Sequence, residues 1–186
     1  MDVTIIIATF GDTKWIELAH ERALPSAMLQ NVAVITHHGP TLHEARNEAA
    51  ELATTEFLCF LDADDSLSPG YLFAMAEATG DLRAPAVSWV TEHSATKPVT
   101  LHTRDIEHMN PCVIGTLIRK DLFTTLGGFR DWPAWEDWDL FLRATRAGAR
   151  IEHVPGAVYR AHMSPGSRNQ SVQDAHRLHA MIKAAA

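Results

Sequence analysis

Three carboxylates follow an apolar run in this chain, and their types and spacing are suited to metal or phosphate chemistry. Asp62, Asp64 and Asp65 come directly after residues 57–61 (FLCFL). An unbroken apolar run of this length is typical of a strand that is buried on both faces of a parallel sheet. Carboxylates this close together repel one another, so they need either full solvation or a bound cation. The stretch is equally consistent with a solvated turn and with a Mg²⁺ or Mn²⁺ site at the carboxyl end of a strand.

A second acidic group is interleaved with tryptophans in residues 132–139 and contains Glu136, Asp137 and Asp139. Apolar residues at helical spacing in 138–148 place the first two carboxylates at a helix N-terminus. Free backbone N–H groups and the helix dipole stabilise a carboxylate there, so these residues either cap the helix or keep a functional carboxylate ionised at neutral pH. The tryptophans mainly fill core in our interpretation, and the alternative is that one offers its flat face to a sugar ring.

Histidines and arginines supply the remaining candidates. His162 ends a predicted strand and precedes a loop rich in Ser, Pro and Gly, residues 163–169, which carries Arg168. The histidine can complete a metal site while the loop orders over a bound diphosphate. Arg46 lies beside the apolar stripe of a predicted helix, where it is either solvated or reaches toward an anionic ligand. The histidine pair at 37–38 does not favour one shared ion, because neighbours on an extended chain point to opposite faces.

The elements that must position these residues alternate between strand and helix over the first eighty residues. Apolar, β-branched stretches predict buried strands at 3–8, 32–35 and 57–61. Helical periodicity predicts a helix from residue 14 that Pro25 ends, a helix over 41–53, and a third that begins at Ser68. Thr41 and Glu44 form a capping box at the start of the second. This order is typical of a nucleotide-binding half with a parallel sheet.

The second half of the chain is less regular. Strands are predicted at 86–91, 112–118, 151–154 and 157–160, with a weaker candidate at 101–103. Pro155 and Gly156 are expected to separate the last two strands. Helices are predicted at 120–126, 138–148 and 171–183.

Composition limits the class of protein. The chain has 186 residues, 46% hydrophobic and 21% charged, with a formal net charge of −7, which indicates one globular domain over 1–186. The acidic balance argues against nucleic acid or an anionic membrane as partner.

Cys59 and Cys112 lack the spacing of a disulfide framework or zinc site. We see neither a signal peptide nor a transmembrane segment of ~18 apolar residues, so we expect a cytoplasmic protein.

Five stretches, taken in order, resemble the family-2 glycosyltransferases of the GT-A fold: VTIIIATF (3–10), ARNEAA (45–50), FLDADD (60–65), GGF (127–129) and EDWDL (136–140). Each is weak alone, but the ordered set spans nearly the whole chain. The resemblance implies an α/β fold, a Rossmann-like three-layer sandwich around a mainly parallel sheet. It also implies a nucleotide-binding half (1–92) and an acceptor-binding, catalytic half (93–186). The expected reaction is metal-dependent, inverting transfer of a sugar from a nucleotide-sugar donor to an acceptor hydroxyl.

The resemblance also implies roles for single residues. Asp137 would be the catalytic base, and Mn²⁺ or Mg²⁺ would be held by Asp64 and Asp62. The donor, expected to be a UDP-sugar, would contact Thr9, Phe10, Arg46, Asp62 and Ala63. From their positions in the sequence, we expect His162 to assist at the cation and Arg168 to contact the diphosphate.

The chain departs from the family pattern in four places. Histidines occupy positions 37–38, where the family usually has an acidic pair that meets the base of the nucleotide, so the base is left open. Ala8 replaces a usual proline. No QxxRW motif follows Asp137, which indicates a non-processive enzyme. The chain is short for the family, so the acceptor side is either reduced or supplied by a partner subunit. The sequence identifies neither the acceptor nor the oligomeric state.

Two alternatives remain. A phosphatase of the haloacid dehalogenase type also ends an apolar strand in DxD, with the first Asp as nucleophile and the second as acid/base. Here two β-α units precede the motif, and no phosphate-binding lysine is evident in the expected context. A non-catalytic module that binds nucleotide sugars would keep the same pocket as an enzyme.

Overall fold

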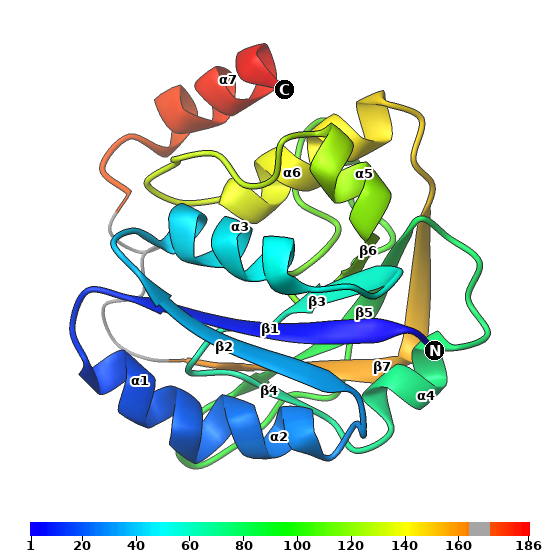
Figure 1. Cartoon of the computed structure of the whole chain (residues 1–186). Coiled ribbons are helices and arrows are strands. Elements are labelled where there is room, and N and C mark those ends of the chain that lie inside the picture. The colour runs from blue at the N-terminus through cyan, green and yellow to red at the C-terminus, as the bar shows by residue number, and fades with distance from the viewer. Residues whose placement is uncertain (164–171) are drawn as a thin grey trace.

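The computed structural model describes residues 1–163 and 172–186, and over these residues a mixed sheet lies between two layers of helices (Figure 1). The strands are β1 (Val3–Phe10), β2 (Ala33–Gly39), β3 (Phe57–Phe60), β4 (Ser66–Leu67), β5 (Leu82–Val90), β6 (Leu117–Arg119) and β7 (Ile151–His162). The helical elements are α1 (Lys14–Leu18), the π-helical turn η1 (Ala19–Ala23), α2 (Leu24–Met28), α3 (Leu42–Leu52), α4 (Tyr71–Met75), α5 (Lys120–Thr125), α6 (Glu136–Arg146) and α7 (Ala175–Ala185).

The sheet has the order β2-β1-β3-β6-β5-β7-β4. β1 pairs in parallel with β2 and β3, and β7 pairs in parallel with β5. β6 runs antiparallel to both β3 and β5, and β4 runs antiparallel to β7. β1, β2, β3, β5 and β7 therefore share one direction, which confirms the predicted α/β fold with a mainly parallel sheet.

The two helical layers bring several element ends to one edge of the sheet. α1 and α2 cover one face, and α3, α5 and α6 lie over the other (Figure 1). The carboxyl ends of β1 and β3 and the N-termini of α3 and α6 all lie at the left of Figure 1. In open α/β sheets this edge is where ligands bind.

The central strands have the burial that their apolar sequences predict. All four residues of β3 are buried, and so are the first seven residues of β1. They form the main core together with Ala49 of α3 and Phe123 of α5. Thr41 is confirmed as the N-cap of α3, because its Oγ1 accepts a hydrogen bond from the Glu44 N–H at 3.3 Å, and the Glu44 carboxylate accepts one from this hydroxyl at 2.7 Å.

The prediction that Pro25 ends the first helix is wrong. Helical structure continues from α1 through η1 and α2 as far as Met28. Pro25 lies in the first turn of α2, where a residue without an N–H leaves no hydrogen bond unmade. The π-helical turn η1 directly precedes α2, so the register of the hydrogen bonds changes just before the proline.

β2 and β7 also differ from their predictions. β2 is the edge strand of the sheet and its residues before Gly39 are exposed or half-buried, so it is not the buried strand that its apolar sequence predicts, and it extends through His37 and His38 to Gly39. β7 is one strand and not two, because Pro155 and Gly156 fall where its register against β5 shifts. A register irregularity of this kind accommodates a proline that a regular ladder would exclude.

The predicted strand over 112–118 is reduced to β6, and residues 101–103 form no strand. The Thr116 N–H donates to the Val113 carbonyl at 2.8 Å, so the chain turns before β6 begins. Gly115 lies against the ring of Tyr159, and its carbonyl accepts a 2.8 Å hydrogen bond from the Tyr71 hydroxyl.

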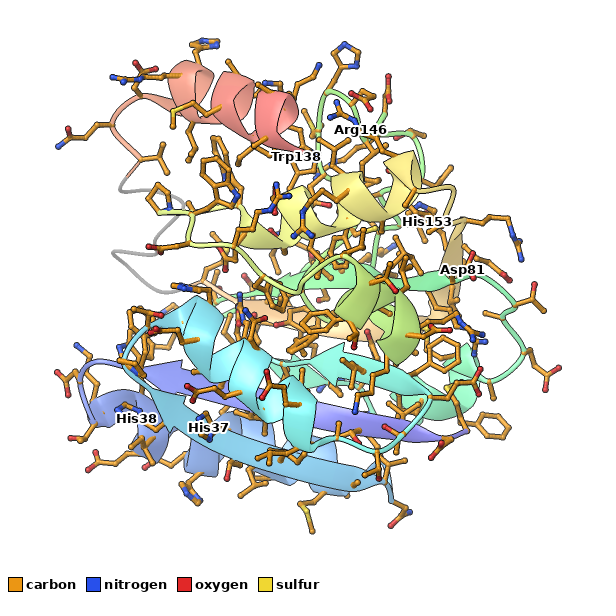
Figure 2. The ribbon with its side chains drawn as sticks, turned by 45° about the horizontal axis from the view of Figure 1, so that its top comes forward. His37, His38, Asp81, Trp138, Arg146 and His153 are labelled. Atoms are coloured by element: carbon orange, nitrogen blue, oxygen red, sulfur yellow. The ribbon has the colours of Figure 1, made fainter. Side chains whose placement is uncertain are left out.

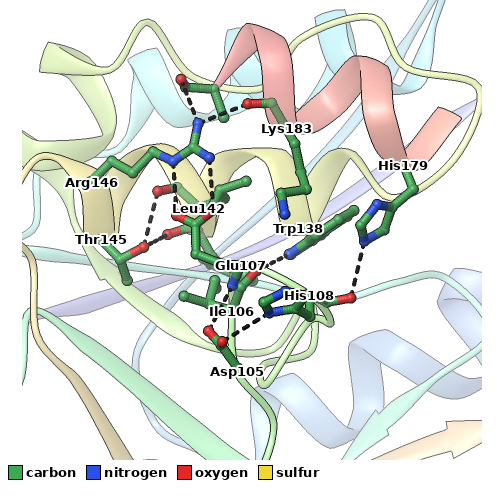
Figure 3. Close-up of polar contacts among 12 residues, drawn as sticks. Asp105, Ile106, Glu107, His108, Trp138, Leu142, Thr145, Arg146, His179 and Lys183 are labelled. Atoms are coloured by element: carbon green, nitrogen blue, oxygen red, sulfur yellow. Dashed lines mark hydrogen bonds and ion pairs between the residues drawn. The ribbon is translucent and has the colours of Figure 1, made fainter. Parts of the chain in front are cut away.

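The C-terminal helix α7 packs on α6 through a smaller apolar cluster that includes Trp138, Leu178 and Ile182. Arg146 of α6 donates hydrogen bonds of 2.9 Å to the carbonyls of Lys183 and Ala186, as Figure 3 shows for the Lys183 carbonyl. No helix in residues 1–163 or 172–186 combines the length and apolar character needed to cross a membrane.

Candidate functional site

Three carboxylates converge at the carboxyl end of β3. One oxygen each from Asp62, Asp64 and Asp65 lies within 4.8 Å of the others. A hydrogen bond of 3.1 Å from the Asp65 N–H to the Asp62 carbonyl closes the turn that holds them. The Asp65 carboxylate is fixed from β7, where the Tyr159 hydroxyl and the His162 N–H each donate to it at 2.7 Å.

The electrostatics of this group favour a cation. Burial and the charge of Asp62 raise the pKa of Asp64 to about 6. Burial, together with the charges of Asp62 and Asp64, raises the pKa of Asp65 to about 8. Raised pKa values mean that three ionised carboxylates are unfavourable here without a compensating charge. A set of carboxylate oxygens at this spacing fits a hard divalent cation such as Mg²⁺ or Mn²⁺.

Arg46 joins this group to the start of α6. Its guanidinium is 3% exposed and donates to Asp62 Oδ1 and to Glu136 Oε1, each at 2.6 Å. It also lies 5.0 Å from the centroid of the Phe129 ring. Burial by itself lowers the pKa of Arg46, but Asp62 and Glu136 together raise that pKa above its ordinary value. The arginine is a permanently charged bridge between β3 and α6, not the solvated helix residue that was one of its two predicted roles.

Asp137 stands in the first turn of α6, which follows Trp135 in a left-handed conformation (φ 62°). Its Oδ1 accepts from the Trp138 N–H at 2.8 Å, and its Oδ2 accepts from the Asn110 side-chain amide at 3.0 Å. Burial and the charge of Glu136 raise the pKa of Asp137 to about 7. Burial therefore opposes the stabilisation of the ionised form that the helix start provides, so the pKa of this carboxyl lies near neutral pH and not well below it.

The other residues of this segment support the helix. Asp139 is fully buried and forms an ion pair of 2.8 Å with Arg143. Trp138 is buried in the α6–α7 cluster, and its indole N–H donates to the Ile106 carbonyl at 2.8 Å (Figure 3). The interpretation of this tryptophan as a core residue is confirmed.

A hollow of about 190 Å³ lies at the end of β1, and Thr9 lines it together with His37 and His38. Thr9 Oγ1 is 3.0 Å from His38 Nδ1, while His37 Nε2 is 2.7 Å from a Glu48 oxygen. The two histidines on β2, whose positions are labelled in Figure 2, therefore have different partners. Phe10, the last residue of β1, is half-buried.

The structure thus brings together most of the candidates from the sequence. Asp62, Asp64, Arg46 and Asp137 lie around one edge of the sheet, and Ala63 is buried within the carboxylate turn. Among the described residues, Asp65 is the third member of the carboxylate group, while His162 Nε2 lies 3.2 Å from Ser66 Oγ. Arg168 and the loop after residue 163 lie outside the described residues.

Sequence reasoning missed four residues that shape the site. Asp65 was visible as the last acid of the apolar run, but the DxD spacing drew attention to its two neighbours. Glu136 is predicted either to cap the helix or to act as a functional carboxylate, and the structure shows that its partner is Arg46. Asn110 has no local signal and Tyr159 is predicted only as a strand residue, so the fold alone places them against Asp137 and Asp65.

Comparison with known proteins agrees with this geometry. The family model described as glycosyl transferase family 2 matches residues 12–132, which include Arg46 and the carboxylate turn but end before α6. No curated protein matches the chain.

Several solved structures share the fold. S. aureus TarS 1-349 in complex with UDP-GlcNAc has a TM-score of 0.66 at 19% identity, over 94% of this chain and 62% of that chain. TarS 1-349 in complex with UDP has a TM-score of 0.59 at 16% identity, over 100% and 70%. S. aureus TarS has a TM-score of 0.57 at 20% identity, over 89% and 37%. This chain therefore spans about three-fifths of the length of the first of these structures.

Proposed function

Because the chain belongs to glycosyl transferase family 2, we propose that it transfers a sugar from a nucleotide-sugar donor to an acceptor hydroxyl, with a divalent cation and with inversion at the anomeric carbon. The observation that carries this proposal is the pair of acidic sites that Arg46 joins: the carboxylate turn after β3 and the start of α6 with Asp137. The complexes of TarS with UDP-GlcNAc and with UDP support a UDP-sugar as the donor.

The carboxylate turn would form the donor side. Asp64, Asp62 and Asp65 would hold Mn²⁺ or Mg²⁺, and a bound cation would neutralise charge on the leaving diphosphate. Arg46 keeps Asp62 in place through a hydrogen bond of 2.6 Å to its Oδ1. In addition, Thr9, Phe10 and Ala63 would line the nucleotide, while His162 would assist at the cation and Arg168 at the diphosphate.

Asp137 would be the general base. Inversion requires the acceptor hydroxyl to attack from the face opposite the diphosphate while a carboxylate takes its proton. Hydrogen bonds from the Trp138 N–H and the Asn110 amide orient both oxygens of this carboxylate. Its pKa of about 7 suits a base that must accept a proton near neutral pH.

Neither alternative is favoured. In a phosphatase Asp62 would be the nucleophile, but its Oδ1 is engaged at 2.6 Å by Arg46, which lowers its nucleophilicity. A module that only binds nucleotide sugars would not need an oriented carboxylate with a pKa of about 7 across from the carboxylate turn.

The test is Asp137→Asn, assayed for transfer and for binding of UDP with Mn²⁺. Loss of general-base assistance should reduce the transfer rate by about 10²–10⁴ while UDP and Mn²⁺ affinities stay nearly unchanged. Asp64→Ala should instead abolish the Mn²⁺ dependence of UDP binding. Asp131→Asn makes the same chemical change at an 81% exposed carboxylate of the segment before α6, and transfer should be unaffected. Transfer by Asp137→Asn at nearly the original rate would refute the assignment.

A further inference from the structure

A second hollow, about 430 Å³ in volume, lies over β4, β5 and β7. Its polar lining consists of Ser66, Ser68, Ser88, Arg160 and His162, and the remainder is small and apolar. We call it the serine groove. None of the candidate residues from the sequence except His162 belongs to it.

The sheet register explains why these residues gather. Arg160 of β7 is paired with Ser66 of β4 on one side and with Ser88 of β5 on the other. Residues opposite one another on adjacent strands point to the same face of a sheet. Ser66, Arg160 and Ser88 therefore form one row on the same face across three strands, and the Arg160 side chain is exposed at the groove. His162 is two residues further along β7 and so faces the same side.

Two of the three serine hydroxyls in the groove keep hydrogen-bonding capacity for a ligand, whereas Ser88 Oγ donates its proton to the Thr96 carbonyl at 2.8 Å. Ser68 Oγ accepts a hydrogen bond of 3.2 Å from the Val158 N–H, which leaves its own proton to donate. Ser66 Oγ lies 3.2 Å from His162 Nε2, and a hydroxyl has one donor and two acceptor positions. Two of the serines can thus donate into the groove beside Arg160.

The charge of the groove is opposite to that of the chain. No acidic residue lines it, although the chain has a formal net charge of −7. Within the described ranges, only Arg160 and Arg177 among the arginines have no side-chain hydrogen bond or ion pair with another described residue. A guanidinium flanked by hydroxyls is the arrangement that proteins use for oxyanions.

The serine groove adjoins the carboxylate turn. Ser66 directly follows Asp65 in the chain, and the His162 N–H donates to the Asp65 carboxylate at 2.7 Å. A molecule in the groove would therefore lie next to the proposed donor site. We propose that the serine groove binds an oxyanion, of the phosphate or carboxylate class, carried by the acceptor, and that Arg160 determines this specificity. The assignment to the acceptor rests on the proposed transferase function, whereas oxyanion binding does not.

Inorganic phosphate is the first probe, titrated into the full chain and followed by NMR of the backbone amides. Saturable shifts are expected at Ser66, Ser88 and Arg160. Arg160→Gln should weaken phosphate binding about tenfold, because a charge-assisted hydrogen bond is lost. Arg160→Lys should retain part of the affinity. Arg177→Gln, the same change at the other arginine without a described partner, should have no effect. Acetate should produce the same pattern and methyl glucoside, a neutral sugar, should not.

UDP with Mn²⁺ is the second probe and separates the groove from the donor site. Arg160→Gln should bind UDP with unchanged affinity. If this variant loses UDP affinity as strongly as phosphate affinity, the groove belongs to the donor diphosphate and the proposal is overturned while the transferase function stands. Absence of saturable phosphate shifts at these amides, or equal shifts with methyl glucoside, would also overturn it. If no variant binds UDP, the donor proposal fails, and the phosphate titration still decides oxyanion binding.

Discussion

Arg46→Met should destabilise the protein strongly. The arginine is 3% exposed and forms two ion pairs of 2.6 Å, with Asp62 and with Glu136. Asp62 is 37% exposed but Glu136 is only 10% exposed, so the Glu136 charge would stay behind in a poorly solvated place. Removing one partner from a buried ion pair typically costs about 3–5 kcal/mol. A domain of this size has a total stability of only about 5–15 kcal/mol, so the loss is a large part of it. Urea unfolding without divalent cations would measure the loss as a change in midpoint at constant slope.

Two further variants make this prediction specific. Arg119 also contacts two carboxylates, those of Glu56 and Asp121, but its side chain is 38% exposed. Arg119→Met should cost no more than about 1 kcal/mol, the usual upper value for exposed pairs. In the Arg46→Met background, Glu136→Gln removes one of the two carboxylates that face the missing cation and should restore part of the stability. A loss of less than about 1 kcal/mol for Arg46→Met would refute the reasoning, since it would mean that the bridge is solvated.

Three other predictions follow from the same geometry. The transfer rate at saturating donor should rise with pH through about 7 and then level off, because Asp137 must lose its proton to act as base; a flat pH–rate profile would contradict this. The pKa of Asp65 in the folded state, about 8, lies above its ordinary value of 3.8. The protonated Asp65 side chain therefore stabilises the folded state fully below about pH 4, and this stabilisation is lost as the pH rises toward 8. Asp65→Asn should flatten this decline in urea unfolding without metal. Gly128→Ala should lower the melting temperature more than Gly127→Ala. Both glycines have positive φ, but only at position 128 would the new Cβ collide with a neighbour, the Asn47 side chain. Equal shifts in melting temperature would show that Asn47 moves freely.

The sequence by itself determined the features that depend on neighbouring residues. The apolar run before Asp62 specified a buried strand, and Thr41 with Glu44 specified where α3 begins. The start of α6 at Glu136 and its acidic first turn were also predictable from local periodicity. These predictions succeeded because burial pattern and capping act over a few residues of chain.

The elements that were predicted wrongly from the sequence depend on how strands from distant parts of the chain pair in the sheet. β2 has an apolar sequence but lies at the edge of the sheet. The sequence of a strand does not specify its position in the strand order. β7 continues through Pro155 because β5 shifts register opposite it. An apolar run specifies that a strand forms but not which strands flank it or on how many faces it is covered.

The tertiary structure alone decided the electrostatics of the site. Arg46 lies 16 residues from Asp62 and 90 residues from Glu136 in the chain, and folding brings both carboxylates to within 2.6 Å of it. The row of Ser66, Arg160 and Ser88 likewise joins three strands that no local pattern connects. The sequence placed Asp137 at a helix start and so predicted a stabilised carboxylate, whereas burial raises its pKa to about 7. The helix dipole is a local property, but desolvation depends on every segment that packs around the group, so only the complete fold sets the sign of that shift.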